Sequence, residues 1–335
     1  MTKVFIIGAT GYIAGAVIEL LSVEHPDLDI TILARTTDKA APMTARYPTI
    51  HVVLGDLDSS LVIEEQSALA DIVFNASDAD HEESARAIIR GLEKRGGGYF
   101  IHTSGVAMLW DTPNGSVVNP KIWDDVTDLE ALRSYPIQAL HRNVEKIVLD
   151  APTSVRVALV SPGGVYGIST GAGKQFTIPI LTSPIVHHGA AFMIGTGAST
   201  GSFVHVLDLA RLFVLLIGEA RKPNGGKADW GVDGYYFGVS QEATIHDLVH
   251  IMGEELAKLG HLKSSTVEVL AIEEVAKIHQ YMPYLFGTNV RAVATRAKRL
   301  GWTPIEASVL ESLVTDLPVQ NPKGRPFTHW AGLGL

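Results

Sequence analysis

The sequence predicts an α/β protein in which a doubly wound parallel sheet is covered by helices on both faces. In the first half of the chain, short apolar runs rich in Val, Ile and Phe alternate with segments of helical periodicity. Most of these runs lack apolar–polar alternation, as expected of strands buried on both faces. Strands that alternate with helices indicate βαβ units with right-handed crossovers. The expected strands cover residues 3–8, 30–34, 49–54, 72–75, 99–103 and 155–161.

The segments between these strands carry the apolar stripes of helices. Between residues 80 and 95, four apolar residues recur with the spacing of one helix face, namely Ala85, Ile88, Ile89 and Leu92. Three glycines at 96–98 end that helix, and Asp80 is expected as a carboxylate at its start. Later in the chain we expect a helix around 210–217, a strand over 235–239 and an amphipathic helix over 244–259.

The length of 335 residues suggests about two domains, at roughly 150 residues each. We expect a nucleotide-binding domain over residues 1–168, to which residues 203–240 return. Residues 169–202 and 241–335 are expected to form a smaller, mostly helical substrate domain. Gly, Ser, Thr and Pro are frequent between residues 162 and 202, which predicts an irregular stretch whose part 176–202 lines the far wall of the cleft.

Composition and charge exclude several classes of function. Lys plus Arg is 27 and Asp plus Glu is 36, so the net charge is −9, which argues against nucleic acid and anionic membranes as partners. Without cysteine the chain has no disulfide, thiolate nucleophile or Cys-ligated metal. No metal site is expected, because His187 and His188, read as neighbours on a strand, would point to opposite faces. No signal peptide or membrane span is evident, and we expect a cytoplasmic protein.

A glycine-rich turn follows the first expected strand. The chain passes from an apolar run into Gly8, continues through Gly11, and a helical pattern opens near Tyr12. Glycine at the first position permits a tight turn, and glycine at the second lets the backbone approach a pyrophosphate. The N–H groups at the start of the following helix would face the phosphates. This pattern predicts a dinucleotide site with a Rossmann-type strand–turn–helix.

The end of the second strand indicates which dinucleotide is preferred. An acidic residue there would bind the ribose hydroxyls of NAD, but the segment after Ile32 reads Leu-Ala-Arg35-Thr. A guanidinium suits a 2′-phosphate as a planar, bidentate donor. We therefore expect NADP, with NAD less favoured.

With these residues, the chain resembles the short-chain dehydrogenase/reductase superfamily, in its extended, NmrA-like branch, which includes fungal NAD(P)-binding, epimerase-like proteins. Further matching segments are the turn at 162–167, the returning helix at 203–210 and the segment 300–304. The resemblance implies that the cofactor is bound by Gly8, Thr10, Gly11, Tyr12, Ile13, Arg35, Asp56, Leu57, Asn75, Ala76, Ser77, His102, Thr103, His141, Pro162, Gly163 and Val165. It also suggests a homodimer through the helices expected at 80–95 and 137–149.

The chain departs from this family at its catalytic residues. Members use a Ser, a Tyr and a Lys, with Tyr and Lys one helical turn apart. Aligned on Glu145, the Lys position holds His141 and the Tyr position holds Ile137, while the Ser position falls on Gly105. The substitute groups expected from the sequence are His141, which would donate a proton or hold the ribose, together with Thr103, Ser104 and Tyr135.

Three functions are compatible with this pattern. The first is an NADPH-dependent reductase of a small organic carbonyl compound of apolar character, with a degenerate Tyr/Lys pair. The second is a non-catalytic, NmrA-like sensor of NADP(H). The third is a redox-neutral isomerase, epimerase or cyclase that binds the same cofactor. In each catalytic case the expected partner is a small-molecule substrate.

Overall fold

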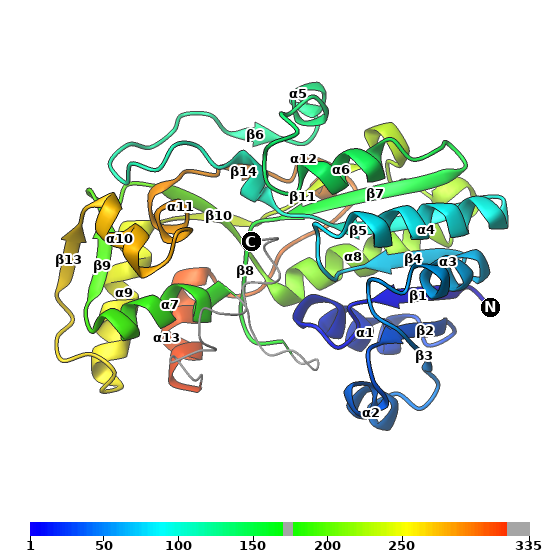
Figure 1. Ribbon diagram of the computed structural model, residues 1–335, viewed down its shortest axis with the longest axis horizontal. Helices are drawn as coiled ribbons and strands as arrows, with labels where there is room; N and C mark the ends of the chain where they lie inside the picture. The colour runs from blue at the N-terminus through cyan, green and yellow to red at the C-terminus, as the bar shows by residue number, and fades with distance from the viewer. Residues whose placement is uncertain (170–176, 320–335) are drawn as a thin grey trace.

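A computed structural model describes residues 1–169 and 177–319 and confirms the predicted fold class (Figure 1). Seven parallel strands form the central sheet in the order β11-β7-β5-β4-β1-β2-β3. The chain builds outward from β1 to β3, crosses back to β4 and continues to the opposite edge, as in a doubly wound sheet. The strands are β1 (Lys3–Ile7), β2 (Asp29–Ala34), β3 (His51–Leu54), β4 (Ile72–Asn75), β5 (Gly98–Thr103), β7 (Val155–Pro162) and β11 (Tyr235–Gly238).

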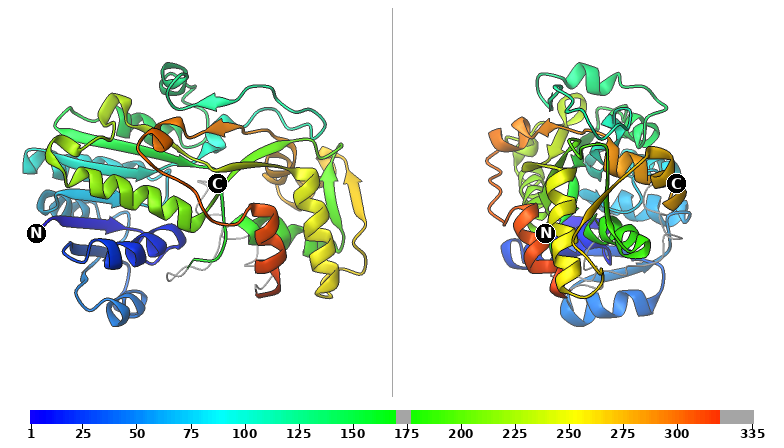
Figure 2. Two further views of the ribbon diagram at one scale, coloured as in Figure 1. Left: turned by 180° about the vertical axis from the view of Figure 1, so that it is seen from behind. Right: turned by 90° about the vertical axis from the view of Figure 1, so that its left-hand side faces the viewer.

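Helices cover both faces of this sheet (Figure 2). On one face α1 (Tyr12–Glu24) packs beside α8 (Val206–Ala220), and on the other α4 (Glu82–Arg95) packs against both α3 (Ser60–Leu69) and α6 (Arg142–Leu149). The strands between these layers are almost fully buried, since β4 and β11 expose none of their side chains. This burial on both faces explains why the strand sequences lack alternation.

The register aligns the carboxyl ends of the strands along one edge. Ile7 lies opposite Asn75, Asn75 opposite His102, and Thr103 opposite Val160. The predicted strand bounds agree with the observed ones to within two residues. In a sheet of this type ligands bind beyond the carboxyl ends of the strands, at the point where the strand order reverses, which here lies between β1 and β4.

The prediction of an irregular stretch over residues 162–202 was wrong. The described part contains β8 (Gly164–Tyr166), α7 (Thr177–His188), β9 (Ala191–Ile194) and β10 (Thr200–His205). α7 forms in spite of an internal proline, because its apolar side chains Ile178, Leu181 and Ile185 are buried, and packing outweighs local propensity. His187 and His188 accordingly end a helix instead of lying on a strand. Phe176, at the start of the expected cleft wall, lies outside the described residues.

The expected helix over 137–149 is shorter than predicted. α6 begins only at Arg142, because His141 adopts a left-handed backbone conformation with φ of 66°. Residues 134–141 form turns instead. The helix therefore does not carry the Tyr and Lys positions of the family pattern on one face.

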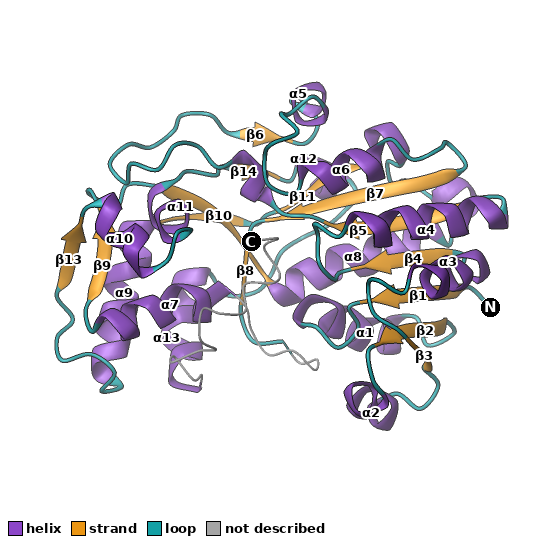
Figure 3. Ribbon diagram, in the orientation of Figure 1, coloured by secondary structure: helices purple, strands orange, loops and turns teal. Residues whose placement is uncertain are grey.

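A second group of elements lies beside the sheet and mixes strands with helices (Figure 3). β10 pairs in parallel with β8 and antiparallel with β12 (Gln241–Thr244), while β9 pairs with β13 (Val267–Leu270). α9 (Ile245–Lys258) matches the helix predicted over 244–259, and Thr244 caps its start by accepting the N–H of Asp247. The remaining elements are α2 (Thr37–Arg46), β6 (Trp123–Asp124), α5 (Leu129–Arg133), α10 (Ile272–Ile278), α11 (Met282–Gly287), β14 (Ala292–Val293), α12 (Thr295–Arg299) and α13 (Val309–Asp316), with short 3₁₀ turns at Val106–Leu109, Pro223–Gly225, Gly231–Asp233 and Leu317–Val319.

The buried side chains form two cores. The first core lies around the seven-stranded sheet, and the second core lies among α7, α9, α11, α13 and the strands β9 and β10. Residues 290–302 lie in sequence between α11 and α13 of the second core, but their buried side chains belong to the first core. Within the described residues, no helix is long and apolar enough to cross a membrane.

Candidate active site

The turn between β1 and α1 has the geometry of a phosphate-binding loop. Gly8 has a φ of 87°, and a Cβ at this position would lie 2.5 Å from the carbonyl oxygen of Ala76. The backbone N–H of Gly11 donates to the carbonyl of Gly8 at 2.8 Å, which closes the turn. No side chain caps the N-terminus of α1, and its first turn holds no acidic residue. Its N–H groups are thus suited to an anionic ligand.

Other predicted cofactor residues lie along the same edge of the sheet. Arg35 follows β2 and is exposed, and Asp56 follows β3. A hydrogen bond from Ser59 holds the pKa of the Asp56 carboxyl below its usual value. Asn75, at the end of β4, is buried and accepts hydrogen bonds from both the backbone and the hydroxyl of Ser77. These contacts fix the loop that the Gly8 turn approaches.

A cavity of about 360 Å³ opens beside this edge, between the two cores. Its walls combine predicted cofactor residues with side chains of the second core. The lining includes Tyr12, Ile13, Ala76, Ser77, Thr103, Ser104, Gly105, Trp110, His141, Pro162, Gly163, Gly164, Val165, Ile180, Leu181, Gly201, Phe203, Ile245, Tyr284, Leu285 and Val290. Gly8, Thr10, Arg35, Asp56, Leu57, Asn75 and His102 lie outside this lining, on the strand edge and its loops.

His141 forms an ion pair with Asp80 at the cavity wall. The Nδ1 atom of His141 lies 3.0 Å from both carboxylate oxygens of Asp80, and the histidine is only 5% exposed. Asp80 was expected only as a helix-start carboxylate, but α4 begins at Glu82 and His81 provides the cap. Sequence reasoning missed this pair. The one available signal was the position of Asp80, shortly after the residues 75–77 that end a neighbouring strand.

Gly105 leaves the space that the imidazole of His141 fills. A Cβ at residue 105 would lie 3.1 Å from His141 Nε2 and 3.3 Å from its Cδ2. Because Nδ1 is bound to Asp80, Nε2 is the ring nitrogen available on the cavity side. Gly105 stands at the position of the family Ser and His141 at that of the family Lys, and these two residues lie close together in space.

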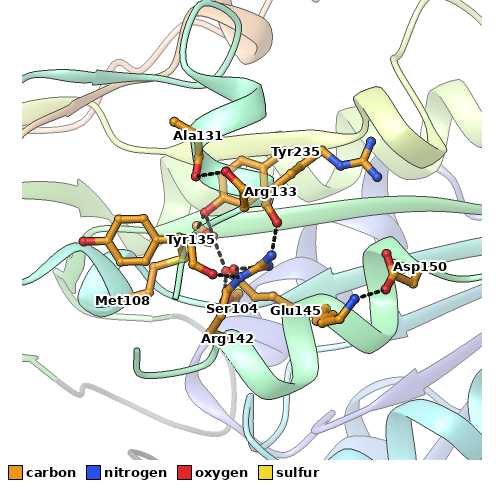
Figure 4. Close-up of polar contacts among 12 residues, drawn as sticks. Ser104, Met108, Ala131, Arg133, Tyr135, Arg142, Glu145, Asp150 and Tyr235 are labelled. Atoms are coloured by element: carbon orange, nitrogen blue, oxygen red, sulfur yellow. Dashed lines mark hydrogen bonds and ion pairs between the residues drawn. The ribbon is translucent and has the colours of Figure 1, made fainter. Parts of the chain in front are cut away.

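The two hydroxyls at the end of β5 differ in their bonding. Thr103 Oγ1 is buried and has no hydrogen-bond partner among the described residues. Ser104 Oγ donates to Glu145 Oε1 at 2.6 Å, within a network that includes Ser161 and Arg142 (Figure 4). Burial raises the pKa of Glu145, although the bond from Ser104 and the charge of Arg142 oppose this shift. Thr103 Oγ1 thus lacks a hydrogen-bond partner behind the cavity surface, whereas the Ser104 proton is held by Glu145.

The structure does not bring Tyr135 into the cavity. Its backbone carbonyl accepts from Arg142 Nε at 3.1 Å (Figure 4), while its ring packs edge-on against Trp123. Burial and the nearby charge of Asp111 raise the pKa of its phenol, the reverse of what a Lys partner would do. Ile137, at the family Tyr position, is half exposed on the surface between α4 and α6.

His102 lies behind the cavity wall. It is 1% exposed, and its Nδ1 lies 3.4 Å from Asn75 Nδ2. Burial and the neighbouring His141 lower its pKa to about 4, so the ring is neutral near pH 7. Its place is therefore that of a support for Asn75 and not that of a proton donor.

The cradle at Gly8 and the uncapped start of α1 fit the phosphates of a dinucleotide. A family described as NAD(P)H-binding matches residues 8–131. The oxidase ucsJ of Acremonium sp is 32% identical over 331 residues, covering 93% of this chain and 95% of that protein. An uncharacterized protein of Saccharomyces cerevisiae is 27% identical over 324 residues, covering 93% and 97% of the two chains.

Solved structures with the same architecture include two sugar-nucleotide enzymes. The dTDP-glucose 4,6-dehydratase DesIV of Streptomyces venezuelae, a double mutant with NAD bound, superposes with a TM-score of 0.64 at 18% identity, covering 93% of this chain and 94% of that one. The UDP-glucose 4-epimerase of Thermotoga maritima has a TM-score of 0.59 at 14% identity, covering 93% and 96%. Fold and site together define a nicotinamide-dinucleotide-binding Rossmann protein. The chain belongs to the short-chain dehydrogenase/reductase superfamily, in its extended, NmrA-like branch.

Proposed function

We propose that this chain is an NADP(H)-dependent oxidoreductase that reduces a small organic carbonyl compound. The observation that carries the proposal is the Asp80–His141 pair at the wall of the cavity, which Thr103 also lines. A titratable group that is oriented by a carboxylate and faces a cavity is the usual arrangement of a general acid or base. The name of the related Acremonium oxidase is in keeping with redox chemistry.

In this proposal the cofactor lies along the carboxyl ends of the strands. The Gly8–Gly11 turn and the start of α1 would bind the pyrophosphate, while Asp56 and Leu57 would contact the adenosine. The exposed guanidinium of Arg35 would bind the 2′-phosphate of NADP. When bound, the nicotinamide would supply the hydride for the reduction.

The residues of the chain would position the carbonyl and move its proton. Thr103 would form a hydrogen bond from its hydroxyl to the substrate oxygen, and this bond would give the otherwise unbonded buried hydroxyl a partner. His141 Nε2–H would transfer its proton to that oxygen as the alcohol forms, and the Asp80 carboxylate would stabilise the charged imidazolium and hold its orientation. The imidazole would then regain a proton from solvent.

Turnover is the direct test of this function. Purified protein is mixed with NADPH and a panel of uncharged aldehydes and ketones, and the reduced-nicotinamide absorbance is followed. We expect oxidation of NADPH with part of the panel, and a loss on the order of 10²-fold in kcat/KM for His141→Gln. NADPH affinity, measured separately by energy transfer from tryptophan, should stay within about twofold.

A second histidine–carboxylate pair provides the matched control. His188 Nε2 lies 3.0 Å from Glu268, and neither residue lines the cavity. His188→Gln should leave kcat/KM unchanged. Tight NADPH binding without turnover across the panel would contradict the reductase and favour the sensor, whereas product formed without net NADPH oxidation would favour a redox-neutral reaction.

A further inference from the structure

The cavity beside His141 has one polar end and one apolar end. The polar groups, His141 and Thr103, come from the loops and strand ends of the first core. The opposite wall belongs to elements of the second core and its neighbours. Most of its side chains are hydrocarbon, namely Ile180 and Leu181 on α7, Phe203 on β10, Ile245 on α9, Leu285 on α11, and Val290. Thr177, Ser202 and Thr288 also line it, but the Ser202 hydroxyl accepts the N–H of Ala292 and the Thr288 hydroxyl donates to the carbonyl of Tyr284.

This apolar wall is held in place by close packing. The Phe203 ring lies over two glycines, because a Cβ at Gly164 would come within 2.7 Å of its Cδ1 and one at Gly201 within 3.0 Å of its Cε2. Trp110 and Tyr284 stack on each other at 5.7 Å between ring centroids and line the same cavity. The Phe203 ring thus occupies space that is open only because residues 164 and 201 are glycines.

Charge is missing from this wall. Of the residues in the described ranges that line the cavity, none is Lys, Arg, Asp or Glu. Sugar nucleotides such as those bound by the related folds carry a diphosphate, which proteins bind with cations or with the N–H groups of a helix start. Helix α9 begins at Ile245 in this wall, but Thr244 caps its start and the acidic Asp247 lies in its first turn. Burying a diphosphate against hydrocarbon without a cation is strongly unfavourable.

We infer that the site takes an uncharged substrate with a single carbonyl or hydroxyl group at one end and an apolar, ring-sized body, and that it excludes sugar nucleotides. The carbonyl end lies at His141 and Thr103, and the body lies against Ile180, Leu181 and Phe203. The orientation of the substrate rests on the proposed reductase function. Its polarity rests on the wall residues alone.

Binding to the protein loaded with NADP⁺ separates these two points, because no reduction takes place with the oxidised cofactor. Calorimetric titration would compare 2-acetonaphthone, 2-naphthoate and UDP-glucose; the first two share a ring system and differ in charge. We expect the ketone to bind at least tenfold more tightly than the carboxylate, and UDP-glucose to bind most weakly. Binding of UDP-glucose or 2-naphthoate as tightly as the ketone would overturn the inference.

A charge placed in the wall should reverse this preference. Ile180 is half-buried at the cavity, so we expect Ile180→Lys to weaken the ketone by at least tenfold and to strengthen 2-naphthoate. Val186→Lys is the matched control, because Val186 lies on the same helix, is half-buried and does not line the cavity. Ketone binding without NADPH turnover would leave this inference standing and contradict the reductase, whereas turnover of an anionic carbonyl compound would do the opposite.

Discussion

The carboxylate of Asp125 accepts the backbone N–H of Arg296 at 2.9 Å through one oxygen, and that of Phe237 at 2.8 Å through the other. Asp125 is fully buried, and its two bonds join strand β11 of the sheet to helix α12, residues that are far apart in the chain. The same burial raises the pKa of its carboxyl to about 6, against the opposing effect of these hydrogen bonds.

The raised pKa of Asp125 predicts how stability changes with pH. Between pH 4 and 6 the folded state retains a proton that the unfolded state releases, so this group lowers the free energy of unfolding as the pH rises. The difference between a folded-state pKa of about 6 and the usual 3.8 corresponds to roughly 3 kcal/mol of unfolding free energy over this interval. Urea unfolding of the wild type and of Asp125→Asn from pH 4.5 to 7 should show the wild type losing stability relative to the variant.

Asp124 is the control for this measurement. Although burial opposes the shift, hydrogen bonds from Thr295 and from the N–H groups of Val126 and Thr127 lower the pKa of its carboxyl. Its contribution is therefore lost only as the pH falls below the usual Asp range. The free energy of unfolding of Asp124→Asn should differ from that of the wild type by a constant amount from pH 4.5 to 7. If the stability of Asp125→Asn fell with rising pH in parallel with that of Asp124→Asn, the assignment to Asp125 would be contradicted.

His102 should produce a pH dependence of the opposite sign. Its pKa of about 4 in the folded state lies below the usual 6.5, so the unfolded state binds a proton first as the pH falls. The wild type should lose roughly 3 kcal/mol relative to His102→Gln between pH 6.5 and 4. NMR of the histidine ring provides an independent check, since titration of the His102 signals between pH 7 and 6 would contradict the prediction.

Asp80→Asn should impair the reaction without impairing cofactor binding. The amide keeps the shape of the carboxylate but removes the negative charge that stabilises an imidazolium at His141. We expect a fall in kcat on the order of 10²-fold, with an altered pH–rate profile and NADPH affinity within about twofold. Asp58→Asn, in the exposed pair with His81, should leave both quantities unchanged, and equal losses in the two variants would argue for a general structural effect.

Gly105→Ala should displace the imidazole of His141. The new methyl group would lie 3.1 Å from Nε2, so the ring must shift by a few tenths of an ångström, and misplacement of a catalytic group on this scale lowers rates strongly. We expect at least a tenfold loss of kcat with little change in thermal stability. Gly218→Ala, whose Cβ would lie at an ordinary 3.4 Å from His25 Nε2 inside α8, should keep full activity and gain about 0.5–1 kcal/mol of stability.

Arg35→Ala tests the preference for NADP. Loss of a charge-assisted bond to the 2′-phosphate should weaken NADPH by about 10- to 100-fold and leave NADH within about twofold. Arg46→Ala, in which the lost guanidinium pairs with Glu19, should change neither affinity. An unchanged NADPH dissociation constant for Arg35→Ala would favour NAD as the natural cofactor.

The sheet and the phosphate turn were predictable because their signals are local. Gly8 follows an apolar strand directly, and any side chain there would meet the backbone at Ala76. The Asp80–His141 pair was not predictable, since the two residues are 61 positions apart and His141 lies in a turn with a left-handed backbone conformation. α7 was missed for another reason: its prolines suggested a loop, while burial against the second core stabilises it as a helix.

The distribution of the two cores along the chain affects how the protein unfolds. Buried residues of the first core come from segments before residue 166, from 204–239 and from 290–302, with second-core segments between them. Each core is thus built from several chain segments that are separated in sequence by segments of the other core. Cleavage of one peptide bond between 239 and 243 would therefore leave segments of both cores in each fragment. Because the two cores share the chain in this way, we expect thermal unfolding in a single cooperative transition.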